Sequence, residues 1–147
     1  MITREDIVAE AREWLGVKWQ HQTSLKGVAC DCIGLIRGVA RGVGFNDPFE
    51  TGEAMRFMGY SPQPEPKALR EACAMFLTRI RIGDAGLGDI LVFRIEKFPM
   101  HFALISNLEP WRMIHGHARA PRKVVENGID AAWQASIVSA HRYRELA

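Results

Sequence analysis

Apolar residues in the first part of the chain recur at the spacing of amphipathic helices. Residues 4–15 carry one apolar stripe, which consists of Ile7, Ala11, Trp14 and Leu15. Thr3 and Asp6 have the spacing of a capping box, and Gly16 suits the position that follows a helix end. The pattern therefore predicts a helix at about residues 4–15.

Two further segments have the same helical periodicity. In residues 32–43 the stripe is Ile33, Ile36, Val39 and Val43; in residues 67–80 it is Leu69, Cys73, Phe76 and Ile80. Asp31 is a suitable cap for the first of these helices, which places Cys32 in its first turn. Residues 45–66 contain four prolines and little periodicity, so we expect a surface excursion there.

From Ile90 onward the pattern changes to short runs with alternating or continuous apolar character. These runs cover residues 90–95, 101–106, 112–117, 123–126 and 136–143. Helices followed by a run of strands joined by short turns are typical of an α+β domain with an antiparallel sheet. A length of 147 residues fits one domain over residues 1–147.

Composition and charge narrow the function classes. The chain is 48% hydrophobic, which supports an ordinary core, and its formal charge is only +2, which argues against nucleic acid as a partner. Three cysteines form no even framework of disulfides. The sequence has no apolar signal region and no run of 18 apolar residues. We therefore expect synthesis in the cytoplasm without an export signal, and no membrane insertion.

Cys32 and three histidines, His101, His115 and His117, are the residues best suited to chemistry. The start of a helix favours a thiolate, so we expect the pKa of Cys32 to be lowered from its ordinary value. A small buried apolar side chain at the helix start is the structural alternative.

The alternation of the two histidine-bearing runs predicts which side chains share a face. His101 shares its face with Ala103 and Ile105, while His115 and His117 share a face with Met113. If the two runs form a hairpin across residues 107–111, His101 lies opposite either His115 or His117, depending on a two-residue shift of register. Partly exposed polar residues at a sheet end are the alternative.

The ordered motifs of the chain resemble a known family. These motifs are DCIGL, GDILVF, HFALIS and MIHGH. They are similar to the NlpC-type cell-wall cysteine peptidases, especially the branch encoded by phages and phage-like gene transfer agents. The resemblance covers nearly the whole chain and implies a papain-like α+β fold, in which the nucleophilic cysteine begins a helix packed on an antiparallel sheet.

The resemblance also implies roles and partners. Cys32 matches the nucleophile, His101 the general base, and His115 the third residue, which orients the base. The implied substrate is a peptidoglycan stem peptide, cleaved between γ-D-glutamate and a diamino acid, with no metal or organic cofactor. Phage-like tail proteins are the implied partners. The lack of an export signal fits delivery to the cell wall in such a particle, release on lysis, and an enzyme of the cytoplasm equally well.

Two positions depart from the usual family pattern. Ile33 stands where the family often has Ser, and Trp19 stands where it often has Tyr; an indole N–H donates one hydrogen bond but cannot act as a phenol does. Trp19, His21, Asp31 and His117 are the remaining candidates for contact with the substrate. Each also has a structural explanation, which for Asp31 is capping of the helix.

Three alternatives remain open at this point. Cys30, Cys32, His115 and His117 offer metal ligands, but their single-residue gaps match zinc spacing poorly. A non-catalytic tail-tip or assembly module on the same fold is the second alternative. The third is amidase or acyl-transfer chemistry, because fold and triad do not determine which carbonyl is attacked.

Asp89, in the turn before residues 90–95, is expected to be structural.

Overall fold

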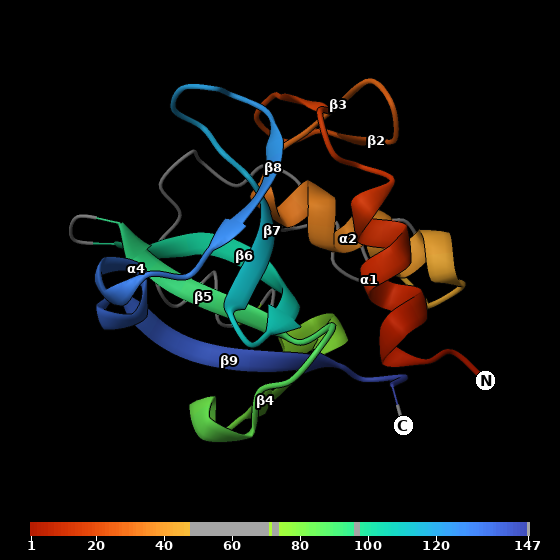
Figure 1. The fold of residues 1–147 in the computed structure, drawn as a ribbon. Coiled ribbons are helices and arrows are strands. Elements are labelled where there is room, and N and C mark those ends of the chain that lie inside the picture. Colours follow the sequence, from red (N-terminus) through yellow and green to blue (C-terminus); the bar gives the residue numbers. More distant parts are fainter. Residues whose placement is uncertain (48–70, 72–73, 96–97, 147) are drawn as a thin grey trace.

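The computed structural model describes residues 1–47, 71, 74–95 and 98–146 (Figure 1). Its helical elements are α1 (Arg4–Arg12), α2 (Cys32–Val43), the 3-10 helix η2 (Ile82–Asp84) and α4 (Ala131–Ala135). Its short strands near the amino terminus are β1 (Lys18–Trp19), β2 (Ser24–Leu25) and β3 (Ala29–Cys30). The remaining strands are β4 (Leu77–Ile80), β5 (Ile90–Ile95), β6 (Phe98–Leu108), β7 (Trp111–Gly116), β8 (Val124–Gly128) and β9 (Ile137–Tyr143).

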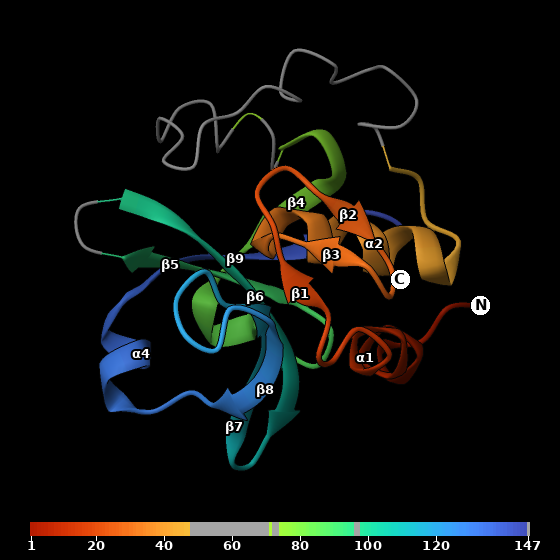
Figure 2. The same cartoon turned by 90° about the horizontal axis from the view of Figure 1, so that it is seen from above.

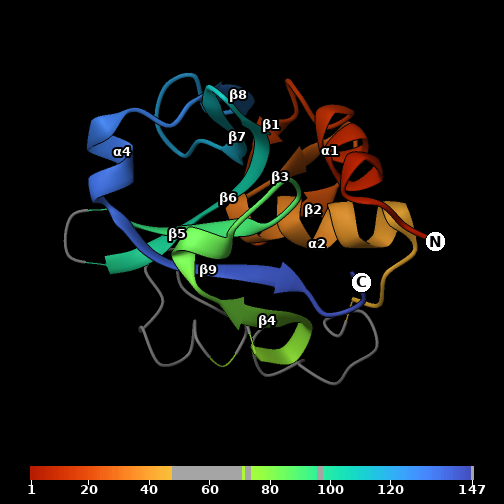
Figure 3. The same ribbon diagram turned by 60° about the horizontal axis from the view of Figure 1, so that its bottom comes forward.

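Six strands form one antiparallel sheet in the order β4-β9-β5-β6-β7-β8. Figure 3 shows β4 at one edge of this sheet and β8 at the other. The three short strands form a second sheet in the order β1-β3-β2, in which β1 and β3 are parallel. The structure thus confirms the α+β class, with the helix of Cys32 packed on an antiparallel sheet.

The sheet separates two apolar layers. Strand residues such as Phe102, Leu104 and Ile114 belong to the cluster that includes the α1 and α2 side chains, whereas Ala103 and Met113 belong to a cluster on the other face. Figures 1 and 2 show α4 on the side of the sheet remote from α1 and α2. The predicted alternation of residues 101–105 is therefore confirmed.

The caps of α1 and α2 are those expected from the sequence. Thr3 and Asp6 form the reciprocal capping box of α1. Asp31 caps α2, which ends at Gly44 in a left-handed conformation. However, α1 ends at Arg12, so the predicted extension to residue 15 is wrong, and Leu15 is exposed rather than part of the apolar stripe.

The helix predicted for residues 67–80 is wrong over its last four residues. Leu77–Ile80 form strand β4, which pairs with β9 from Leu77↔Tyr143 to Ile80↔Ala140. Thr78 and Ile80 are β-branched, which suits a strand. The edge of β9 that does not pair with β5 supplies their backbone hydrogen-bond partners, and helical periodicity does not reveal such a distant partner. Cys73 and Leu69 lie outside the described residues.

The segment expected to be a surface excursion begins with buried residues. Phe45 packs at 8% exposure in the main core, and the carboxylate of Asp47, at 4%, pairs with Arg37 and Arg41 of α2. Buried ions require such partners. The expectation therefore does not hold for Phe45 and Asp47, whereas Asn46 between them is exposed; residues 48–66 lie outside the described part of the chain.

The segment after α1 joins the two sheets beside β8. Gly16 donates its backbone N–H to Val124 and Trp19 donates its own to Arg122, each at 2.9 Å. Lys18 and Lys123 also form an antiparallel bridge. Through these bonds the edge of β8 near Val124 is covered, and the residues that precede Cys32 are held against the main sheet.

Candidate active site

Cys32 is the first residue of α2, and Asp31 fixes this helix end. The Asp31 side chain accepts the backbone N–H of Gly34 at 2.7 Å and that of Gln22 at 2.8 Å. It is buried, at 3% exposure. The Asp31 carboxylate therefore binds both the first turn of α2 and the preceding loop, as expected of a helix cap.

The loop before Cys32 approaches the helix so closely that it requires a glycine. The backbone N–H of Asp31 donates to Thr23, and Ser24 Oγ donates to the carbonyl of Gly34 at 2.6 Å. A Cβ on Gly34 would lie 1.9 Å from the carbonyl oxygen of Thr23. This explains why Gly follows Cys-Ile in the motif: the loop crosses α2 where only a hydrogen fits.

The start of α2 lies where β6 and β7 stop pairing. Pairing of the two strands ends at Leu104↔Ile114, and the backbone N–H of Phe102 donates to the Cys32 sulfur. A Cβ on Gly116 would lie 3.6 Å from the backbone nitrogen of Cys32. The sulfur is therefore held next to the residue that follows His101.

The structure corrects the expected ionisation of Cys32. Burial, followed by the Asp31 carboxylate, raises the pKa of the Cys32 thiol to about 12, against the smaller effect of hydrogen bonds from the Phe102 and Ile33 backbones. Desolvation and a like charge both disfavour the thiolate. The prediction of a lowered pKa is wrong, because the half-buried thiol is desolvated and lies beside the carboxylate that caps the helix.

His101 and His115 form a buried imidazole pair. Nε2 of His101 lies 2.7 Å from Nδ1 of His115, and the two residues are 5% and 0% exposed. Burial is the main cause that lowers the pKa of His115 to about 4 and that of His101 well below 6.5; neighbouring imidazoles add to it. Both rings are therefore neutral at pH 7.

The strand register shows how this pair forms. Leu104 pairs with Ile114 and Ile105 with Met113, which by continuation makes His117 level with His101 and His115 level with Ala103. The hydrogen bond to His115 is therefore diagonal, and the expectation that bonded histidines lie directly opposite each other is wrong. Diagonal neighbours on one face remain within reach of long side chains.

His117 lies beside the pair without replacing His115. Its ring centroid is 6.2 Å from that of His101 and 5.3 Å from that of His115. Its Nδ1 accepts the backbone N–H of Arg119 at 3.2 Å. The structure thus places His117 at the edge of the site, with its Nδ1 bound to the following turn rather than to the imidazole pair.

Two residues that no sequence pattern indicated, Asn127 and Trp133, complete the surroundings of the pair. Nε2 of His115 lies 2.6 Å from Oδ1 of Asn127 on β8. Trp133 of α4 packs against both rings, with centroids 5.7 Å from His101 and 5.6 Å from His115. Neither belongs to the quoted motifs, although period-2 alternation places Asn127 on one face of its strand with Val125.

Trp19 and His21, the remaining predicted site residues, belong to the loop side of the site. Trp19 pairs with Cys30 across β1 and β3, and the guanidinium of Arg122 lies 5.4 Å from its ring centroid. His21 Nδ1 lies 3.9 Å from Oδ2 of Asp31. Trp19 is therefore paired with the strand that leads to Cys32, and His21 lies beside the carboxylate that caps its helix.

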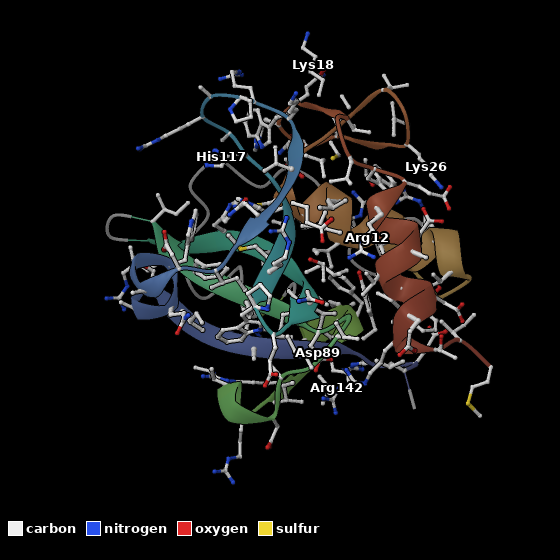
Figure 4. The ribbon with its side chains drawn as sticks, in the orientation of Figure 1. Arg12, Lys18, Lys26, Asp89, His117 and Arg142 are labelled. Atoms are coloured by element: carbon white, nitrogen blue, oxygen red, sulfur yellow. The ribbon has the colours of Figure 1, made fainter. Side chains whose placement is uncertain are left out.

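Asp89 is structural, as expected from its place in a turn. It is 0% exposed and accepts hydrogen bonds from Arg142 at 2.8 and 2.9 Å and from the backbone of Gly86. Arg4 lies 3.3 Å away. Figure 4 shows Asp89 and Arg142 together, remote from His117. The carboxylate therefore ties α1, β5 and β9 together outside the site.

Within the described ranges, no three His, Cys, Asp or Glu side chains are grouped so that they could hold a metal ion. Cys30 and Cys32 are both thiols. In the same part of the chain, none of the helices has the length and apolar character needed to span a bilayer.

The fold is that of NlpC/P60 proteins. An NlpC/P60 family protein from Bacillus cereus superposes with a TM-score of 0.68 and 18% identity, over 97% of this chain and 40% of its own. The NlpC/p60 domain of the peptidoglycan hydrolase SagA gives 0.62 and 22%, over 95% of this chain and 97% of that domain. The Mycobacterium tuberculosis peptidoglycan hydrolase RipB gives 0.62 and 16%, over 98% and 65%.

The chain thus spans two fifths of the B. cereus protein and about two thirds of RipB. No protein-family model and no curated protein matches its sequence. At these identities the comparisons establish the papain-like α+β fold of NlpC/P60 proteins.

Proposed function

We propose that the protein is a cysteine peptidase that hydrolyses peptidoglycan stem peptides, with Cys32 as nucleophile, His101 as general base and His115 as the residue that orients the base. One observation carries the proposal. The thiol at the start of α2 accepts the backbone N–H of Phe102, and the preceding residue, His101, is bonded to a second buried imidazole. Covalent acyl transfer needs this arrangement, in which a nucleophile lies next to a base and the base is bonded to an orienting group.

The ionisation of the site determines how the reaction begins. The thiol and both imidazoles are neutral at pH 7, because burial raises the pKa of Cys32 to about 12 and lowers that of His115 to about 4. The proton of Cys32 therefore moves to His101 as the sulfur attacks the carbonyl carbon, rather than before the substrate binds. In this respect the pair behaves more like Ser–His than like a preformed thiolate–imidazolium.

The remaining steps follow from the charges created by attack. The sulfur–carbon bond forms, and negative charge develops on the carbonyl oxygen beside the positive end of α2, which stabilises it. Protonated His101 then gives its proton to the amine nitrogen as the carbon–nitrogen bond breaks. Water, deprotonated by His101, attacks the thioester, and the departing Cys32 sulfur takes that proton back, which releases the acid.

The choice of stem peptides as substrate has two supports. The motifs of this chain resemble NlpC-type cell-wall peptidases, and two proteins of similar fold, SagA and RipB, are peptidoglycan hydrolases. The bond that the resemblance implies lies between γ-D-glutamate and a diamino acid. The same resemblance supports a place in a phage-like tail, from which the enzyme would act on the wall; the protein content of purified particles tests that part.

Digestion of purified peptidoglycan, followed by mass spectrometry of the released fragments, tests the function. We expect fragments with a new amino group on the diamino acid and a new γ-carboxyl on glutamate, with Cys32→Ala as the inactive control. Fragments from cleavage of the amide between sugar and peptide would identify an amidase instead. No cleavage by the folded wild type, across stem peptides of different diamino acids, would favour a binding or assembly module.

A further inference from the structure

The amide of Asn127 has a defined orientation. Its Nδ2 donates to the carbonyl oxygen of Gly128 at 3.0 Å, while its Oδ1 lies 2.6 Å from Nε2 of His115. The flipped amide would set two oxygens against each other at the Gly128 end, so the observed orientation is the one with both bonds satisfied. Asn127 therefore presents an acceptor to His115.

This orientation determines where the protons of the two rings lie. Since Oδ1 of Asn127 can only accept, Nε2 of neutral His115 carries the hydrogen and its Nδ1 has the lone pair. This Nδ1 atom lies 2.7 Å from Nε2 of His101, which must then be the donor. The proton-free nitrogen of His101 is consequently Nδ1, the one that can take a proton from the thiol.

The three groups form one line across adjacent strands of the sheet. β8 pairs with β7 through Met113↔Asn127 and His115↔Val125, so the contact between Asn127 and His115 is also diagonal. His101 on β6, His115 on β7 and Asn127 on β8 thus follow the same slant. The line ends at the backbone carbonyl of Gly128, which fixes the orientation of the Asn127 amide.

We propose that Asn127 is a positioning residue that fixes the Nε2–H tautomer of His115 and, through it, the Nε2–H tautomer of His101, leaving Nδ1 of His101 as the base for Cys32. This inference rests on the proposed function for its catalytic consequence. Its structural part, the tautomer of each ring, is independent of any reaction.

The groups facing His115 define what a change at Asn127 alters. The titratable neighbours are His101 on β6 and His117 directly after β7, while β8 offers the neutral Asn127 and α4 offers Trp133. The hydrogen bond to Asn127 favours protonated His115, against burial and the charge of His117, which lower its pKa. Replacing Asn127 therefore shifts the titration of His115 in a direction that depends on the replacement.

Nuclear magnetic resonance of the ring nitrogens tests the tautomers directly. In the ¹⁵N-labelled protein at pH 7, we expect His115 and His101 each to show a protonated Nε2 and an unprotonated Nδ1. Asn127→Leu, which has a similar volume and no acceptor, should abolish the preference of His115 for Nε2–H. Asn107→Leu is the matched control, because the Asn107 amide donates to the backbone of Pro110 in the β6–β7 turn; both tautomers should remain unchanged in it.

Kinetics on one stem-peptide substrate tests the consequence. We expect Asn127→Leu to lower kcat about tenfold or more with KM changed less than about twofold, because base orientation acts on the chemical step. The acid limb of the pH–rate profile should move to lower pH in Asn127→Leu, which loses the hydrogen bond. It should move to higher pH in Asn127→Asp, whose carboxylate favours the protonated imidazole.

The outcomes separate this inference from the proposed function. Wild-type protein with the expected tautomers but no cleavage of any stem peptide would overturn the function alone. An Nδ1–H tautomer at His115 in the wild type, or unchanged tautomers in folded Asn127→Leu, would overturn the inference. Acid limbs that coincide in wild type, Asn127→Leu and Asn127→Asp would also overturn it, since a purely structural role does not move them in opposite directions.

Discussion

The rings of His101 and His115 meet almost at right angles, with an interplanar angle of 82° and ring nitrogens 2.7 Å apart. This edge-on arrangement leaves one nitrogen of each ring for a different partner. His115 uses its second nitrogen toward Asn127, and His101 lies next to Phe102, whose N–H reaches the Cys32 sulfur. The pair therefore connects the β7–β8 side of the sheet with the start of α2.

Replacement of Cys32 tests the nucleophile. Cys32→Ala should lower turnover by more than about a thousandfold without unfolding the protein, since it removes the attacking sulfur. Cys30→Ala is the matched control: Cys30 is 0% exposed in the core and its backbone carbonyl, not its thiol, binds Gln20. Turnover and circular dichroism check both. Equal loss in the two variants would contradict the assignment.

Alkylation with iodoacetamide tests the resting ionisation. Because burial raises the pKa of the Cys32 thiol to about 12, the thiolate fraction increases tenfold per pH unit below that value. We expect the alkylation rate of Cys32 to rise continuously from pH 6 to 10. The Cys32→Ala protein gives the background from other thiols. A rate that is constant between pH 5 and 8 would instead indicate a preformed thiolate–imidazolium pair.

A histidine series tests the diagonal contact. His101→Ala should cost the most, about 10² to 10⁴-fold in kcat, because it removes the base. His115→Ala should cost less, and His115→Asn less again, since an amide keeps an acceptor for the His101 ring. His117→Ala should remain close to wild type. A large loss in His117→Ala together with an active His115→Ala would show that His117 orients the base.

Acid should destabilise the fold through its buried neutral histidines. Burial lowers the pKa of His115 and His141 from 6.5 to about 4. Between these values the unfolded chain binds more protons than the folded one, so the stability is complete above pH 6.5 and is lost as the pH falls toward 4. We expect urea midpoints to fall across this window and to fall less steeply in His141→Gln. An equal slope would contradict the role of His141.

The crossing of the loop over α2 predicts a sensitive glycine. A Cβ on Gly34 would lie 1.9 Å from the Thr23 carbonyl oxygen and 2.9 Å from the Asp31 carboxylate, so Gly34→Ala should destabilise the protein by about 1–3 kcal/mol or more and displace the cap of Cys32. Gly83→Ala is the control, because a Cβ there meets no described atom within 4 Å. Urea unfolding and the alkylation rate of Cys32 measure both effects; a neutral Gly34→Ala would contradict the close approach.

Local patterns of the sequence were sufficient for several elements of the site. Asp31 as a cap, Cys32 in the first turn of a helix, and the shared face of His101 and Ala103 all depend on residues close in the chain. Helical and strand periodicities express backbone geometry over a few residues. For the same reason the pattern failed at Leu77–Ile80, where pairing with the distant β9 outweighed local helical spacing.

The tertiary structure decided the contacts that depend on register and burial. It alone showed that His115 binds His101 diagonally, that Asn127 reaches His115 from β8, and that burial beside a carboxylate raises the pKa of Cys32. From the residue pattern alone we could predict the antiparallel α+β class, the helix of Cys32 and the residues available for chemistry. Which of these residues meet, and in which protonation state, follows from packing between distant segments, because desolvation and strand register are properties of the assembled sheet.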